Sequence, residues 1–263
     1  WMWLRDNRPH IWERTEWILS DQEFLLKEWG APEYWTDLSS ASREGMLNVE
    51  TREWSQPLHD LVGIPLSKRA KIAYEPGKVV GTVDPDVARR AGLAPDTKLC
   101  VGAHDQNCCT FGGGAVRPGD CVMVMGTFGS CFVVMDEPKL DPLRTLIVKP
   151  NHGMASWTIE AFSNTSASSL RWYRDTFCHL EVAAGNVVGH DPYNLITCEA
   201  EGSEIGAHGV TFLPFLGGAS GARQNPDARA NFNGMSLATT QRDIARAVLE
   251  GICFEMKDIV KSQ

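Results

Sequence analysis

Several patterns that would assign this chain to a common class are missing from its sequence. No apolar run approaches the roughly 18 residues of a membrane span, and no basic-then-apolar secretory signal stands at the N-terminus. We therefore expect a cytoplasmic protein with no membrane partner. The eight cysteines include no Cys-x-x-Cys pair and stand mostly in apolar contexts, which predicts small buried side chains in a reducing compartment.

The short motifs of several enzyme classes are also missing. There is no Walker-type Gly-x-x-x-x-Gly-Lys-Ser/Thr and no Gly-x-Gly-x-x-Gly, which argues against P-loop and Rossmann nucleotide sites. No Gly-x-Ser-x-Gly elbow occurs, and the seven histidines show no metal-type spacing, so we predict neither a serine hydrolase nor a protein-held metal. The formal charge of -8 argues against a nucleic-acid partner, but it does not exclude small phosphorylated ligands.

The residues that are present predict an α/β chain with mixed sheets. At 263 residues and 43% hydrophobic content, the chain can form one large domain or two ordinary ones. Apolar residues at helical spacing, or a proline at the start and a glycine at the end, predict helices within residues 1–30, 85–92, 166–177 and 240–260. The tryptophans of the first thirty residues are expected to pack in the core. We place the division between two domains after residue 114, giving 1–114 and 115–263.

Asp105 is the first candidate for chemistry. It follows the short apolar run from Leu99 to Val101 and precedes a probable helix that ends in three glycines at 112–114. Catalytic groups collect at strand ends in α/β folds, and a carboxylate there can accept the proton of a substrate hydroxyl. A helix N-cap explains the same residue, and the two roles are compatible. His104 and His152 are further candidates for lining the pocket.

A second signal lies about twenty residues later, at Gly126-Thr127-Phe128. Two β-branched apolar runs, 121–125 and 131–135, flank it and predict a hairpin. Glycine lets the backbone approach a ligand closely, so this turn could hold phosphate oxygens, although an ordinary hairpin turn explains it as well. A base and a phosphate cradle are what phosphoryl transfer to a hydroxyl needs from a protein. Asp37, before a run of serines, is either a helix cap or part of a ligand-facing loop.

Two longer stretches resemble the signatures of the FGGY carbohydrate kinase family. Residues 1–7, Trp-Met-Trp-Leu-Arg-Asp-Asn, are similar to the last part of the first signature. Residues 230–235, followed by 243–244 and 247–250, are similar to the second. The resemblance runs over essentially the whole chain.

This resemblance implies an actin-like, ribonuclease H-like fold of two domains with a cleft between them. It also implies transfer of the ATP γ-phosphate to a sugar hydroxyl with Mg²⁺, with Asp105 as the base. Gly126, Thr127 and Phe128 fall at the second phosphate motif, although Phe128 departs from the usual Ser or Thr. Substrate contacts are expected from His104, Gln106 and Asp37, and a homodimer is one expected assembly.

The resemblance also indicates what lies outside this chain. The chain opens at Trp1 without an initiator Met and closes directly after a helical pattern, so we expect a longer polypeptide. The family's first phosphate motif would precede Trp1 and its adenosine motif would follow Gln263. The isolated chain is therefore expected to lack normal ATP binding and kinase activity.

The substrate stays open between two classes of sugar kinase, and a third hypothesis concerns binding alone. Residues 225–229 and 170–175 resemble xylulokinase-type members, whereas the Gly-Thr-Phe turn and residues 171–178 also resemble autoinducer-2 kinases. The loop 217–221 lacks the Gly-Glu-Arg-Thr-Pro run common in xylulokinases. A non-catalytic actin-like module that binds a sugar or a partner protein would be expected to lack the base, but Asp105 is present.

Overall fold

The fold is described from a computed structural model, covering residues 1–75, 77–151 and 156–263. The chain divides into two compact units. The first comprises Trp1–Gly119, Val134–Lys139 and Val148–Thr158, and the second comprises Asp120–Val133, Leu140–Ile147 and Ile159–Gln263. The predicted division after residue 114 stays a prediction.

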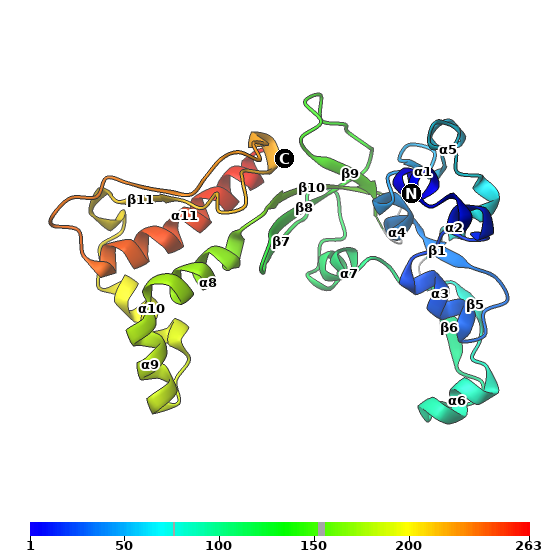
Figure 1. The fold of residues 1–263 in the computed structure, drawn as a ribbon, viewed down its shortest axis with the longest axis horizontal. Helices are drawn as coiled ribbons and strands as arrows, with labels where there is room; N and C mark the ends of the chain where they lie inside the picture. Colours follow the sequence, from blue (N-terminus) through cyan, green and yellow to red (C-terminus); the bar gives the residue numbers. More distant parts are fainter. Residues whose placement is uncertain (76, 152–155) are drawn as a thin grey trace. The chain divides into compact units, whose positions relative to one another are not determined.

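The elements up to residue 119 are short helices alternating with short strands (Figure 1). The helices are α1 (Met2–Asn7), α2 (Pro9–Arg14), α3 (Asp21–Glu28), α4 (Leu38–Arg43), α5 (Gln56–Val62), the 3₁₀ turn η1 (Leu66–Lys68), α6 (Pro85–Ala91) and α7 (Asp105–Gly112). The strands are β1 (Trp35–Asp37), β2 (Leu47–Asn48), β3 (Glu53–Trp54), β4 (Lys71–Ala73), β5 (Val79–Thr82) and β6 (Lys98–Cys100).

Residues from 120 onward form one four-stranded sheet, a helical segment and a small hairpin-like pair. The strands are β7 (Cys121–Met125), β8 (Gly129–Met135), β9 (Ile147–Pro150), β10 (Trp157–Ser163), β11 (Thr211–Leu213) and β12 (Asn231–Asn233). The helices are α8 (Ser166–Phe177), α9 (His179–Val188), α10 (Pro192–Glu201), α11 (Gln241–Lys261) and the 3₁₀ turns η2 (Ala207–Gly209) and η3 (Gly221–Arg223).

Strand pairing confirms the expectation of mixed sheets. β1 pairs with β4 in parallel, whereas β5 with β6, β7 with β8 and β11 with β12 are antiparallel. The larger sheet has the order β7-β8-β10-β9. The hairpin expected around residues 126–128 is confirmed, with Met125 opposite Gly129.

Helix α11 organises the core of the second unit. Its apolar positions recur every three or four residues, so one face is buried against β11, α8 and α10. Thr240 and Asp243 form a capping box at its start, and Ser203 and His208 also hydrogen-bond to Asp243. These bonds hold the pKa of Asp243 well below its ordinary value. Figure 1 shows α11 (red) running alongside β11.

Two expectations about buried residues are wrong. Six of the eight cysteines are exposed, and only Cys131 and Cys178 are buried. Of the first five tryptophans, only Trp12 packs, partly buried, against a core cluster, whereas Trp1, Trp3, Trp17 and Trp29 are exposed. An apolar local context therefore does not by itself bury a side chain, because a helix or strand at the surface presents one side to solvent.

Candidate active site

Asp105 is the first residue of α7, five residues beyond Cys100, the last residue that pairs in β6. Its side chain is 87% exposed. The carboxylate Oδ1 accepts a hydrogen bond from the Gln106 amide at 2.7 Å, and His104 Nε2 lies 3.3 Å from the same oxygen. The N-cap residue is His104, so the interpretation of Asp105 as the cap is wrong. An exposed carboxylate at the start of a helix is open to a substrate hydroxyl.

A buried network holds the turn that precedes Asp105. Asp37 is fully buried and caps α4, since its Oδ1 accepts from the amides of Ser39 at 2.8 Å and Ser40 at 3.1 Å. The Ser39 hydroxyl donates to the same Asp37 oxygen and accepts from the His104 amide at 3.0 Å. The capping role expected of Asp37 is confirmed, and through Ser39 it fixes the backbone beside Asp105.

Two further polar side chains flank this turn. Gln22 Nε2 donates a hydrogen bond to Asp37 Oδ2 at 3.4 Å. Oε1 of the same Gln22 lies 3.8 Å from the position that a Cβ atom on Gly102 would occupy. Gln106 has a buried Oε1 with no hydrogen-bond partner among the described residues. Buried acceptors are normally satisfied, so this oxygen stands out as an acceptor without a partner beside Asp105. His152 lies outside the described residues.

The Gly126–Phe128 turn is attached to the start of α8. Gly126 O accepts from the Ala167 amide at 2.9 Å, and Thr127 O accepts from the Ser168 hydroxyl at 2.9 Å. Behind the turn, a Cβ on Gly129 would stand 2.5 Å from Met256 Sδ and 2.9 Å from Ser166 Cβ. Only glycine therefore lets β8 approach α8 and α11 this closely.

Beside this turn lies a cavity of about 390 Å³ that the sequence did not reveal. It is lined by Thr127, Ala167, Ser168, Arg171, Arg174 and Tyr193. Arg174 also stacks on the Tyr193 ring at 4.8 Å and pairs with Asp175. Two guanidinium groups and three hydroxyls around one cavity are a suitable set of donors for phosphate oxygens.

A signal for this cavity does exist in the sequence. Ser168, Arg171 and Arg174 recur every three residues on α8, so they share one side of the helix over about two turns. What the sequence cannot show is that Thr127, some forty residues earlier, packs against that side.

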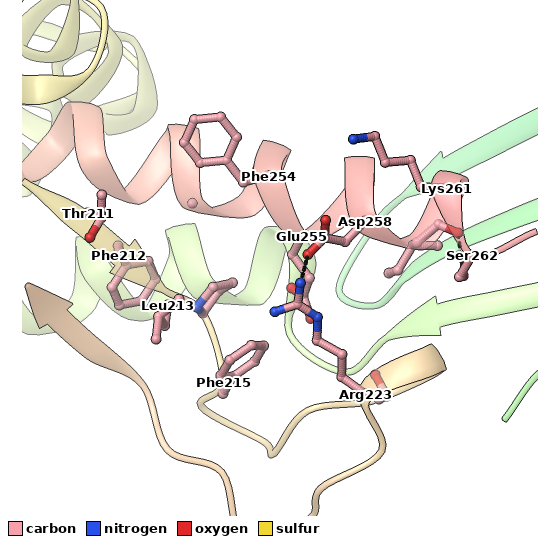
Figure 2. A pocket seen from close by; sticks show the side chains of 14 residues that line it. Thr211, Phe212, Leu213, Phe215, Arg223, Phe254, Glu255, Asp258, Lys261 and Ser262 are labelled. Atoms are coloured by element: carbon pink, nitrogen blue, oxygen red, sulfur yellow. Dashed lines mark hydrogen bonds and ion pairs between the residues drawn. The ribbon is translucent and has the colours of Figure 1, made fainter. Parts of the chain in front are cut away.

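A different cavity, of about 450 Å³, lies between β11 and the last turns of α11 (Figure 2). Phe215 and Phe254 contribute apolar surface, and the Arg223–Asp258 pair at 2.7 Å lies at its edge. Burial raises the pKa of Glu255, which accepts a hydrogen bond from Ser163 at 2.7 Å. None of the predicted site residues that the structure describes lines this cavity.

Across residues 1–75, 77–151 and 156–263, no helix is long and apolar enough to cross a membrane. In the same ranges, no three His, Cys, Asp or Glu side chains gather as they would around a metal ion.

Comparison with known proteins adds two family matches in chain order. Residues 1–112 match the N-terminal domain of the FGGY family of carbohydrate kinases, and residues 121–263 match its C-terminal domain. The chain belongs to the FGGY family of carbohydrate kinases. The expected family and its actin-like fold are thereby confirmed.

Individual FGGY relatives differ in their substrates. The chain is 27% identical to gluconokinase of Bacillus subtilis over 97% of its length, which is 49% of that protein. It is 29% identical to autoinducer-2 kinase of Klebsiella pneumoniae, over 90% of this chain and 44% of that protein. The structure of a xylulose kinase from Lactobacillus acidophilus superposes with a TM-score of 0.87 and 26% identity, covering 99% of this chain and 51% of that one. The chain thus spans about half the length of these relatives.

Proposed function

We propose that the full-length protein transfers the γ-phosphoryl group of ATP to a hydroxyl of a small sugar, polyol or sugar acid, with Asp105 as the general base. The observation that carries this proposal is the exposed Asp105 carboxylate at the start of α7, within a chain that matches both FGGY domains in order. A carboxylate in that position can hydrogen-bond the reacting hydroxyl without first breaking a buried contact.

The proposed reaction assigns separate tasks to the residues. Asp105 accepts the proton of the substrate hydroxyl while the oxygen of that hydroxyl attacks the γ-phosphorus. The bond between the γ-phosphorus and the oxygen that bridges it to the β-phosphate breaks, and ADP leaves. Gln106 and His104 are proposed to hold neighbouring hydroxyls, which is consistent with the unpartnered Gln106 Oε1. Asp37 is proposed to position the turn that carries Asp105. The Ser39 hydroxyl, which donates to Asp37 and accepts from the His104 amide, supports this role.

Phosphate binding is proposed for the Gly126–Phe128 turn and the adjacent cavity. Thr127 and Arg171 line that cavity together, and Arg171 is exposed there. Phe128, which is 59% exposed, does not line this cavity. Mg²⁺ is proposed to arrive with ATP, because this ion retains several waters and binds mainly through substrate phosphates.

The substrate is the open part of this proposal. Similarity to a gluconokinase, an autoinducer-2 kinase and a xylulose kinase at 26–29% identity supports each class about equally. Phosphorylation of autoinducer-2 in signalling is therefore the second candidate. We expect ADP release by the full-length protein with one member of a panel of gluconate, xylulose, polyols and autoinducer-2. Absence of ADP release with every member would contradict the proposal for these substrate classes.

A further inference from the structure

Two cysteine side chains meet on one face of the β7–β8 hairpin. Cys121 begins β7 opposite Val133, and Cys131 lies in β8 opposite Met123, so the cysteines are diagonal neighbours. Their Sγ atoms are 3.3 Å apart. Both thiols are free, and a disulfide bond would draw the sulfurs to roughly 2.0 Å. Neither residue belongs to the proposed catalytic or phosphate-binding set.

The two thiols differ in their access to solvent. Cys121 is exposed, whereas Cys131 is fully buried. Burial, together with the neighbouring Cys121, raises the pKa of Cys131 to about 12, so Cys131 keeps its proton at neutral pH. An oxidant dissolved in water therefore meets Cys121 first, with a second thiol already in contact.

We propose that Cys121 and Cys131 form a reversible oxidation site, at which a peroxide converts the two thiols into a disulfide across the hairpin. The Cys121 thiol loses its proton, and the thiolate attacks one peroxide oxygen. An S–O bond forms, the O–O bond breaks, and the leaving hydroxide takes up the Cys121 proton as water. The Cys131 sulfur then attacks the Cys121 sulfur, the S–S bond forms, and the S–O bond breaks. The departing hydroxide takes the Cys131 proton. In sum, two thiols and hydrogen peroxide give one disulfide and two waters.

This site lies on the same hairpin as the Gly126–Phe128 turn. The cross-link would fix β7 against β8 beside the turn whose carbonyls accept hydrogen bonds from Ala167 and Ser168. Disulfides of this kind in a reducing compartment are transient and are reversed by dithiols. The cross-link depends on the hairpin alone and not on the proposed kinase function. Its test is therefore independent of kinase activity.

The test is peptide mapping of the full-length protein after treatment with hydrogen peroxide and alkylation of the remaining thiols. Chymotryptic cleavage after Phe128 separates Cys121 from Cys131 unless a disulfide joins them. We expect one linked pair of peptides that separates again after dithiothreitol. Cys198→Ser, which changes an exposed cysteine on α10, serves as the control and should leave the linkage intact.

Variants at the pair itself decide the outcome. In Cys131→Ser the linkage should vanish and Cys121 should be trapped as its sulfenic acid by dimedone. If removal of the buried thiol prevents folding, Cys121→Ser gives the complementary result, with Cys131 remaining reduced. Separate alkylation of Cys121 and Cys131 in the treated wild-type protein, or linkage of Cys121 to a different cysteine, would overturn the proposal.

Discussion

Asp105 and the Gly126–Phe128 turn both lie at the beginning of a helix, but they are held there in opposite ways. Asp105 is itself the first residue of α7, and its carboxylate remains 87% exposed. The turn instead lies beside α8 and uses its carbonyls to accept bonds from Ala167 and Ser168. The acid is thus open to a reacting hydroxyl, whereas the turn is a fixed wall of a cavity.

This difference suggests a division of labour between the two units. A general base must reach the reacting hydroxyl and exchange a proton, which an exposed side chain can do. A phosphate cradle must be fixed before the phosphate arrives, because donors placed in advance need no reorganisation during the reaction. The predictions that follow test these two requirements separately.

The largest effect is expected for Asp105→Asn. The amide cannot accept the hydroxyl proton, so we predict that kcat for sugar phosphorylation falls by roughly 10²–10⁴-fold, with little change in the KM for sugar. ADP release by the full-length protein measures both constants. Asp86→Asn, which alters an exposed carboxylate in the first turn of α6, is the matched control and should retain wild-type turnover.

The next effect concerns the fixed turn. Gly129→Ala places a methyl group against Met256 and Ser166, and such overpacking should lower the free energy of unfolding by about 1–3 kcal/mol. Urea unfolding followed by circular dichroism measures the change. Gly112→Ala is the control, because a Cβ there meets nothing within 4 Å. Equal stability of the two variants would show that the turn is not held tightly against α8.

A smaller effect is expected for Arg171→Ala. Loss of one exposed guanidinium from the cavity beside Thr127 should raise the KM for ATP about tenfold, since charge-assisted hydrogen bonds contribute roughly 1.5–3 kcal/mol when well formed. Added salt should shrink the difference from wild type. Arg90→Ala, on the exposed last turn of α6, should leave the KM for ATP unchanged.

The smallest effect is expected for Ser39→Ala. This variant removes the hydroxyl that connects Asp37 to the His104 amide, at a cost of about 1 kcal/mol in unfolding free energy. We expect kcat to fall by a few-fold while the KM for ATP stays constant. Ser42→Ala, which removes a hydroxyl from the same helix, is the control. A larger loss of kcat in Ser42→Ala than in Ser39→Ala would contradict the claim that the Ser39 hydroxyl positions Asp105.

The sequence predicted those elements whose ends are marked by local chemistry. Proline at the start and glycine at the end bound α6, and apolar residues at helical spacing define α8 and α11. Helices α9 and α10 were not expected. Apolar residues lie on several sides of α9, and two of them, Leu180 and Val187, are exposed. The helix therefore lacks the separate apolar and polar faces by which a surface helix is recognised in a sequence.

The site was predictable only where its residues are close in sequence. Asp105 follows a strand pattern and Gly126-Thr127 sits inside a hairpin pattern, and both patterns act locally. The bond from His104 to Ser39 spans 65 residues, and the cavity shared by Thr127 and Arg171 depends on how β7, β8 and α8 pack. Tertiary packing of this kind has no periodic signature in the sequence.

The most direct test is calorimetric titration of ATP into two variants of the full-length protein, Asp105→Asn and Arg171→Ala. If the first unit supplies the base and the second holds the phosphates, Asp105→Asn should bind ATP within about twofold of wild type, and Arg171→Ala about tenfold more weakly. Unchanged ATP affinity in Arg171→Ala, together with weakened affinity in Asp105→Asn, would contradict this division of labour.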